Sequence, residues 1–157
     1  MNVVKYFMFM GLIFLGGFTM TSFASEEERD FHVTKVVINK PFNIVWEWVT
    51  NPLKFPEIYP NWVKEIKKTG ENTYFVTTPS GWAHSMTTKF DIKTGTIDFD
   101  IDPGESSRSR IFAIGSGAVV HIHMAVKHPQ VPSEIWEDLK NAVDQDYLNA
   151  KKVIEKQ

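Results

Sequence analysis

The last stretch of the chain, residues 133–156, has the most regular pattern in the sequence and constrains the fold most. Ser133 is a suitable N-cap, and Lys151 and Lys152 lie where the negative end of a helix would be. A helix of this length spans roughly 35 Å, so it needs a curved sheet to lie against. Its apolar residues recur at steps of three and four, the spacing of one helix face, at Trp136, Leu139, Val143, Tyr147, Ala150 and Ile154.

The first 24 residues predict a secretory signal peptide. Lys5 forms a short basic region, an apolar run follows, and Ser22 and Ala24 supply the small residues of a cleavage site. An uncleaved membrane anchor is the alternative, but the run is short for a span of about 20 residues and glycines interrupt it. We therefore expect a periplasmic or secreted domain over residues 25–157, with no stable membrane insertion once the leader is cleaved.

Charge and cysteine content exclude several classes of protein. The chain has 17 Lys and Arg against 19 Asp and Glu, and the leader contributes only Lys5, so the mature domain is slightly acidic. This argues against a nucleic-acid partner, which would require a basic stripe on the surface. Since the chain has no Cys, it has neither a disulfide framework nor a lipid-modified N-terminal Cys.

Signals for strands and short helices follow one another along the middle of the chain. β-branched residues predict a first strand over residues 31–40. Pro41 then opens a short amphipathic helix that ends at Pro52, and a Pro-interrupted segment over residues 53–62 has room for a turn or two of helix. Gly and Pro separate six further strands, over residues 62–68, 73–78, 82–93, 96–102, 108–114 and 118–127.

Two of these strands alternate regularly between apolar and polar residues. Ile97, Phe99 and Ile101 take one face, and aspartates take the other. Met86 and Phe90 alternate with polar residues in the same way. Together with the short connections, this alternation predicts an antiparallel meander with one dry face and one solvated face.

This order of elements, the phrase KPFNIVWEWVTNPLKFPEIYPNWVKEIK and the amphipathic C-terminal helix resemble the START/Bet v 1-like superfamily of polyketide cyclases and lipid-transport proteins. The resemblance covers residues 31–156. It implies an α+β helix-grip fold, in which a curved antiparallel seven-stranded sheet wraps around the long C-terminal helix and two short helices follow the first strand. It also implies an apolar cavity between sheet and helix. The leader sets this chain apart from the many cytoplasmic members.

A cavity for an apolar ligand needs apolar walls and a few polar groups that orient the ligand. His84 shares a strand face with Met86 and Phe90, and Arg110 shares one with Phe112. Arg110 would bind a carboxylate or phosphate head group, and His84 would donate to it or act as a base. The candidate ligand-binding residues are Tyr59, His84, Met86, Phe90, Phe99, Arg110, Phe112, Ile122, Met124, Leu139, Val143 and Tyr147.

Each of these candidates has a plainer interpretation. The apolar side chains would simply fill a solid core, as in most protein interiors. Arg110 would lie exposed at a rim, and His84 would bond a backbone carbonyl. The strand parity that places them inside depends on strand boundaries that the sequence does not fix.

A metal site and covalent catalysis are less favoured. His121 and His123 share one face of a strand, and three aspartates, Asp98, Asp100 and Asp102, share a face of another. We interpret Ile122 and Met124 as the inward pair, which places both His outside, where they contribute ordinary sheet electrostatics. The sequence has no Cys nucleophile and no Gly-x-Ser-x-Gly turn, so it does not support covalent catalysis. We expect no metal and no cofactor.

The expected function is that of a secreted or periplasmic protein that binds a hydrophobic or amphipathic small molecule in an internal cavity. The short helices and the Pro-interrupted segment 56–60 near the mouth would be the gate. The alternative is a polyketide cyclase- or isomerase-like enzyme that uses the same cavity. A third possibility is a solid-cored interaction domain that presents its aspartate-lined sheet face to a partner.

Overall fold

The computed structural model describes residues 30–102, 105–127 and 131–157. The predicted signal peptide lies outside the described residues. No helix among those residues is both long enough and apolar enough to cross a membrane.

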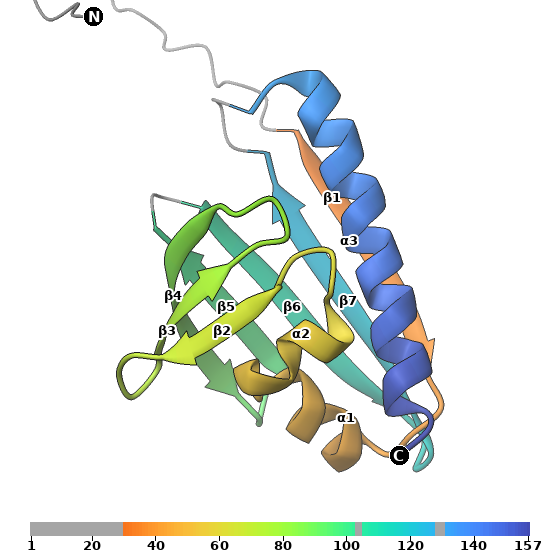
Figure 1. The fold of residues 1–157 in the computed structure, drawn as a ribbon. Helices are drawn as coiled ribbons and strands as arrows, with labels where there is room; N and C mark the ends of the chain where they lie inside the picture. Colours follow the sequence, from red (N-terminus) through yellow and green to blue (C-terminus); the bar gives the residue numbers. More distant parts are fainter. Residues whose placement is uncertain (1–29, 103–104, 128–130) are drawn as a thin grey trace, which may run out of the picture.

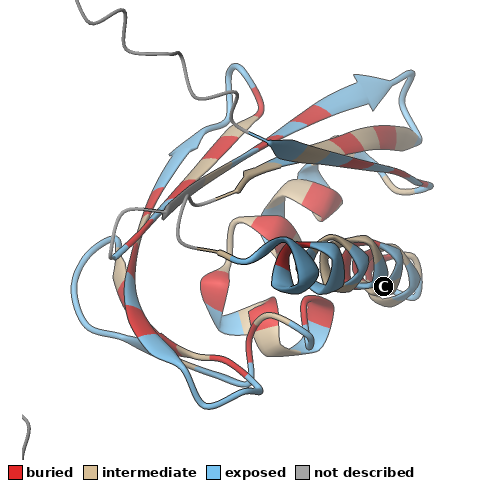
Figure 2. Ribbon diagram, turned by 90° about the horizontal axis from the view of Figure 1, so that it is seen from above, coloured by how far each residue is buried: buried red, intermediate tan, exposed pale blue. Residues whose placement is uncertain are grey.

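One curved antiparallel sheet forms the body of the domain, and its ribbon bends around the helices (Figures 1 and 2). Its strand order is β1-β7-β6-β5-β4-β3-β2, so all neighbours except β1 and β7 are consecutive in sequence. This is the predicted helix-grip fold. The strands are β1 (Phe31–Ile38), β2 (Glu65–Lys68), β3 (Thr73–Thr77), β4 (Ala83–Asp91), β5 (Thr96–Ile101), β6 (Glu105–Ile114) and β7 (Ala118–Val126).

The helices lie in the concavity of this sheet (Figure 2). Three short pieces follow β1, and one long helix ends the domain. They are α1 (Phe42–Val49), the 3₁₀ helix η1 (Pro52–Lys54), α2 (Phe55–Ile58) and α3 (Ser133–Ile154). Ser133 is the first residue of α3 and not its N-cap, because the extended backbone of Pro132 precedes it. The strand predicted from Trp62 begins later, at Glu65.

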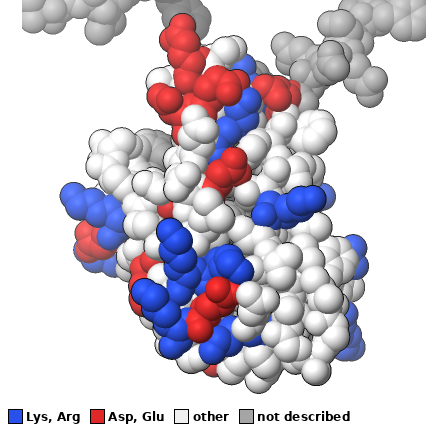
Figure 3. All heavy atoms as spheres, turned by 90° about the vertical axis from the view of Figure 1, so that its right-hand side faces the viewer, with Lys and Arg blue, Asp and Glu red and all other residues white. Residues whose placement is uncertain are grey.

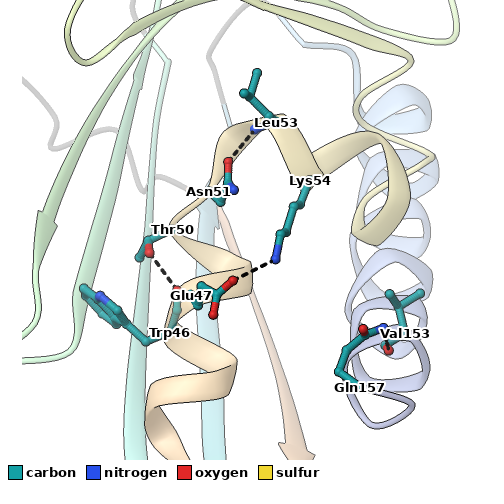
Figure 4. A network of polar contacts seen from close by, with 8 residues as sticks. All are labelled: Trp46, Glu47, Thr50, Asn51, Leu53, Lys54, Val153 and Gln157. Carbon is teal, nitrogen blue, oxygen red and sulfur yellow. Dashed lines mark hydrogen bonds and ion pairs between the residues drawn. The ribbon is translucent and has the colours of Figure 1, made fainter.

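Side-chain bonds shape the joint between α1 and η1 (Figure 4). The Thr50 hydroxyl donates to the carbonyl of Trp46 at 2.6 Å, closing the last turn of α1. Asn51 accepts from the backbone N–H of Leu53 at 3.2 Å and caps η1. Lys54 then reaches back to Glu47 at 3.1 Å. The next helix, α2, packs against α3.

The inner face of the sheet holds the core. Register places alternate residues of neighbouring strands opposite one another, so Val36 of β1 lies beside His121 of β7, which lies beside Ile111 of β6. All three are buried. From the helices, Phe55 and Ile58 of α2 complete this core.

The outer face divides into two halves. Around β4, β5 and the start of β6 it is charged, with Lys89 on Asp100 at 2.8 Å and Arg108 near Asp98 at 3.5 Å. Toward β1, β7 and the end of β6 it carries exposed apolar side chains. These are Phe31, Val33, Val37, Phe112, Ile114 and Met124.

The predicted facing of β7 is wrong, because its Ile122 and Met124 belong to this apolar outer half. Met124 is 37% exposed, whereas His121 and His123 are 1% and 8% exposed and lie inside. Ile122 alternates with the two His, so it lies on the outer face with Met124. Hydrophobicity alone favours the opposite facing, because Ile122 and Met124 are more apolar than the two His that alternate with them. The inward His residues instead meet polar and aromatic partners on β6 and α3.

Candidate functional site

A pocket of about 150 Å³ lies between the sheet and α3. It opens beside the first half of α3, where Leu139 lines it and is nevertheless 43% exposed. The lining residues among those described are Tyr59, Trp62, Phe99, Ile101, Ser107, His123, Ala125, Val126, Val131, Trp136, Leu139, Val143, Asp146 and Tyr147.

Three parts of the chain build this pocket. The inner faces of β5, β6 and β7 supply the floor, including Phe99 and His123. The helical spacing of α3 aligns Trp136, Leu139, Val143 and Tyr147 along one wall. The segment after α2 closes the third side with Tyr59 and Trp62. The walls are therefore mainly apolar and aromatic, as expected for a small-molecule site.

A buried polar network forms one end of the pocket. The Ser109 hydroxyl lies 2.9 Å from Nδ1 of His123 and 3.0 Å from the hydroxyl of Tyr147, so hydrogen bonds join all three side chains. The ring of Tyr147 is 5.5 Å from that of Tyr59 and 4.7 Å from that of His121, measured between centroids. Through His123 and Tyr147, this group presents neutral hydrogen-bonding side chains to a mainly apolar space.

Burial keeps the network uncharged near neutral pH. It lowers the pKa of His123 to about 4, and that of His121 to about 3, because an imidazolium would lose its hydration there. Burial likewise raises the pKa of Tyr59 and Tyr147 well above their usual value. The tyrosines therefore remain protonated hydrogen-bond donors, and the imidazoles remain neutral.

Among the described residues of the pocket wall, Asp146 is the one acidic residue, and it binds the segment after α2 to α3. Its Oδ1 accepts from the backbone N–H and the side-chain amide of Asn61, both at 2.9 Å. Its Oδ2 accepts from the backbone N–H of Trp62 at 3.0 Å. Asn149 adds a bond to the carbonyl of Glu57 at 2.8 Å. These bonds hold in place the segment that the sequence suggested as the gate.

The structure brings some of the predicted site residues together and places others elsewhere. Those that line the pocket are Tyr59, Phe99, Leu139, Val143 and Tyr147. Met86 is fully buried in the core instead, and Phe90 lies at the margin, 37% exposed, with its ring 6.3 Å from that of Phe99.

The two predicted head-group residues, Arg110 and His84, are not in the pocket. Arg110 and Phe112 lie on the outer face, where the guanidinium donates to the carbonyl of Thr94 at 3.1 Å and stacks over Phe112 at 4.8 Å. His84 is buried on the inner face of β4 against the ring of Trp82 at 4.2 Å. Its ring nitrogens have no hydrogen-bond partner among the described residues, and burial lowers its pKa.

Sequence reasoning missed most of the polar part of the site. Ser107, His123, Trp136 and Asp146 line the pocket without having been proposed as ligand-binding residues. The sequence ESSRSR could have indicated the inward face of this strand. Arg108 and Arg110 share one face, and two Arg are more easily solvated than buried. That argument would have turned the intervening Ser residues inward, toward His123.

The residues considered for a metal site lie on opposite sides of the sheet. His121 and His123 face α3, while Asp98 and Asp100 pair with cations on the outer face. Within the described ranges, no group of three or more His, Asp or Glu side chains is placed to hold a metal ion.

Comparisons with known proteins identify the fold but no sequence family. No family model matches the chain, and no curated protein matches its sequence. Solved structures do match. An uncharacterised protein from Bacillus thuringiensis is similar with a TM-score of 0.66 and 15% identity, over 82% of this chain and 100% of that chain.

Two further structures have informative names. The Zhui aromatase/cyclase from a Streptomyces species is similar with a TM-score of 0.58 and 16% identity, over 81% of this chain and 92% of that one. A START superfamily protein from Mycobacterium smegmatis has a TM-score of 0.56 and 14% identity, with 80% and 94% covered. The chain therefore has the helix-grip fold of the START and polyketide cyclase-like proteins.

Proposed function

We propose that this protein binds a hydrophobic or amphipathic small molecule in the pocket between its sheet and α3, without altering it. The observation that carries the proposal is the composition of the pocket, a mainly apolar and aromatic space whose wall includes His123 and Tyr147, both bonded to Ser109 behind them. The apolar body of a ligand would gain roughly 25 cal/mol for each Å² removed from water. The network would orient its polar end by hydrogen bonds.

Filling the pocket tests this proposal. Ala125 lines the pocket from β7, and its neighbour Met124 faces outward. We expect Ala125→Phe to weaken binding of the neutral fluorescent reporter N-phenylnaphthylamine by about tenfold or more, because the new ring occupies the ligand's space. Met124→Phe is the matched control and should bind as the wild type does. Equal binding by wild type and Ala125→Phe would contradict the proposal, with thermal unfolding checking that both variants are folded.

We further propose that the domain acts outside the cytoplasm, after removal of the predicted leader. The support is the sequence pattern of the first 24 residues. The intact mass of the protein recovered from its own host tests this, since cleavage after Ala24 leaves Ser25 as the first residue.

A cyclase- or isomerase-like enzyme is the second candidate, and one observation favours it. A neutral imidazole, a hydroxyl and a protonated phenol are hydrogen-bonded in series on the wall of the pocket, an arrangement that can relay a proton. Tyr147→Phe separates the two functions. It should abolish turnover of the natural ligand if the protein is an enzyme, and only weaken binding if the protein is a carrier.

A further inference from the structure

The charge of the pocket bears on the class of ligand that it accepts. Among the described residues that line the pocket, none is Lys or Arg, and the one formal charge belongs to the carboxylate of Asp146. Asp146 is buried, and its described partners are the N–H groups of Asn61 and Trp62, with no cation among them. A ligand carboxylate or phosphate would therefore lose its hydration without meeting a positive charge.

The aromatic walls of the pocket also disfavour an anionic ligand. Tyr59, Trp62, Trp136 and Tyr147 surround the same space as Asp146. The face of an aromatic ring carries partial negative charge, so it attracts a cation and repels an anion.

The first turns of α3, which lie beside the opening, carry more acidic than basic side chains. Glu134, Glu137 and Asp138 belong to the same turns as Trp136 and Leu139, and Lys140 pairs with Glu137 at 2.7 Å. Figure 3 shows the side of the molecule where α3 lies, with mainly acidic side chains and a basic one among them at its upper end, and mainly basic side chains toward its lower end. A cationic ligand approaching the opening would be attracted, and an anionic one repelled.

We propose that the pocket selects its ligands by charge, accepting apolar molecules with an uncharged or protonated-amine head and rejecting those with a carboxylate or phosphate head. The inference rests on the proposed binding function and names its ligand class. It replaces the expectation from Arg110, which had favoured an anionic head group and lies on the outer face.

Three naphthalene compounds of matched size test the proposal: naphthylmethylamine, naphthylmethanol and naphthoate. Each is titrated by calorimetry into the wild-type protein near neutral pH and low salt, and each also competes with the neutral reporter N-phenylnaphthylamine. We expect the affinities for the amine and the alcohol to exceed the affinity for the carboxylate by about tenfold or more. The preference for the amine should shrink as salt is added.

Each outcome decides one of the two proposals. If naphthoate binds as tightly as naphthylmethylamine, the charge selection is overturned, while reporter binding still supports a ligand-binding pocket. If neither the reporter nor any of the three compounds binds, both proposals fail.

A pair of variants assigns the effect to the pocket. Asp146→Asn removes the buried charge and should bring the affinities for amine and carboxylate closer together. Asp100→Asn makes the same chemical change on the outer face and should leave their ratio unchanged. The comparison in the wild-type protein decides the proposal even if Asp146→Asn fails to fold.

Discussion

At the scale of single residues, Ser109 links the sheet to α3. Its hydroxyl bonds Nδ1 of His123 and the hydroxyl of Tyr147, which also pairs with the hydroxyl of Tyr59. Both of the groups that Ser109 bonds are deeply buried. Where a buried polar group loses its partner, the cost of its lost hydration is no longer offset.

Ser109→Ala is therefore expected to lower the free energy of unfolding by about 1–3 kcal/mol, because it leaves two buried groups without that partner. Urea denaturation monitored by tryptophan fluorescence measures the change. Ser85→Ala is the control, since Ser85 is exposed on the outer side of β4, and it should stay within about 0.5 kcal/mol of the wild type. Equal effects of the two changes would show that the network contributes little.

The buried His pair makes stability depend on pH. In the unfolded chain each His takes up a proton near the ordinary pKa of 6.5, but in the folded protein His121 and His123 do so only near about 3 and about 4. Acid therefore favours the unfolded state. The free energy of unfolding should fall as the pH is lowered from about 6.5 to about 4.5, by up to about 1.4 kcal/mol per pH unit for each His.

His121→Phe should remove one of these contributions and flatten the pH dependence over that interval. Urea denaturation at a series of pH values measures the slope for both proteins. Above about pH 7 both should have the same pH dependence, which serves as the internal control. A variant with the full wild-type slope between pH 6.5 and 4.5 would contradict the assignment to His121.

At the scale of elements, the bond between α3 and the segment after α2 determines how the pocket is closed. The carboxylate of Asp146 accepts three hydrogen bonds from that segment, and Asn149 adds one to the carbonyl of Glu57. The Pro-rich sequence of this segment suggested low-cost opening. These bonds make opening dependent on breaking charge-assisted contacts instead.

Asp146→Ala should destabilise the domain by about 2–3 kcal/mol and release this segment first, because hydrogen bonds to a charged group are strong. Hydrogen exchange should show the backbone amides of Asn61 and Trp62 losing protection. Gln145→Ala, at the exposed neighbouring position of α3, is the control and should leave exchange of both amides unchanged. Unaltered protection in Asp146→Ala would mean that the segment is held by packing alone.

Helices and strands were predictable from the sequence because their signals are local: Gly and Pro mark the ends of elements, and the spacing of apolar residues marks the type of element. The strand signals ended at Gly and Pro, and the observed strands end within a few residues of those positions. Hydrophobicity predicted the wrong facing of β7, since Ile122 and Met124 are more apolar than His121 and His123, with which they alternate. Only their tertiary partners, Ser109 and Tyr147, make burial of the His residues favourable.

In the candidate site, too, the residues with a local pattern were predictable and those with distant partners were not. Leu139, Val143 and Tyr147 were predictable as one wall because α3 is strongly periodic. Asp146 was not, because its partners Asn61 and Trp62 are more than eighty residues away in the chain. Periodicity specifies which side of a helix is buried, but it does not specify which buried residue meets a distant loop.

At the scale of the whole molecule, the sheet and α3 meet without filling the space between them. Phe99 approaches from β5 while Leu139 and Val143 approach from α3, and all three line one pocket. Had these side chains packed against each other throughout, the fold would be a solid interaction domain. The central claim is that the pocket is occupied by a ligand in the protein's own environment.

Native mass spectrometry of the protein purified from its own host tests this claim most directly. We expect a mass above that of the polypeptide. Organic extraction should remove the additional mass, and the Ala125→Phe variant should lack it. A wild-type protein that carries no additional mass and binds no neutral reporter would contradict it.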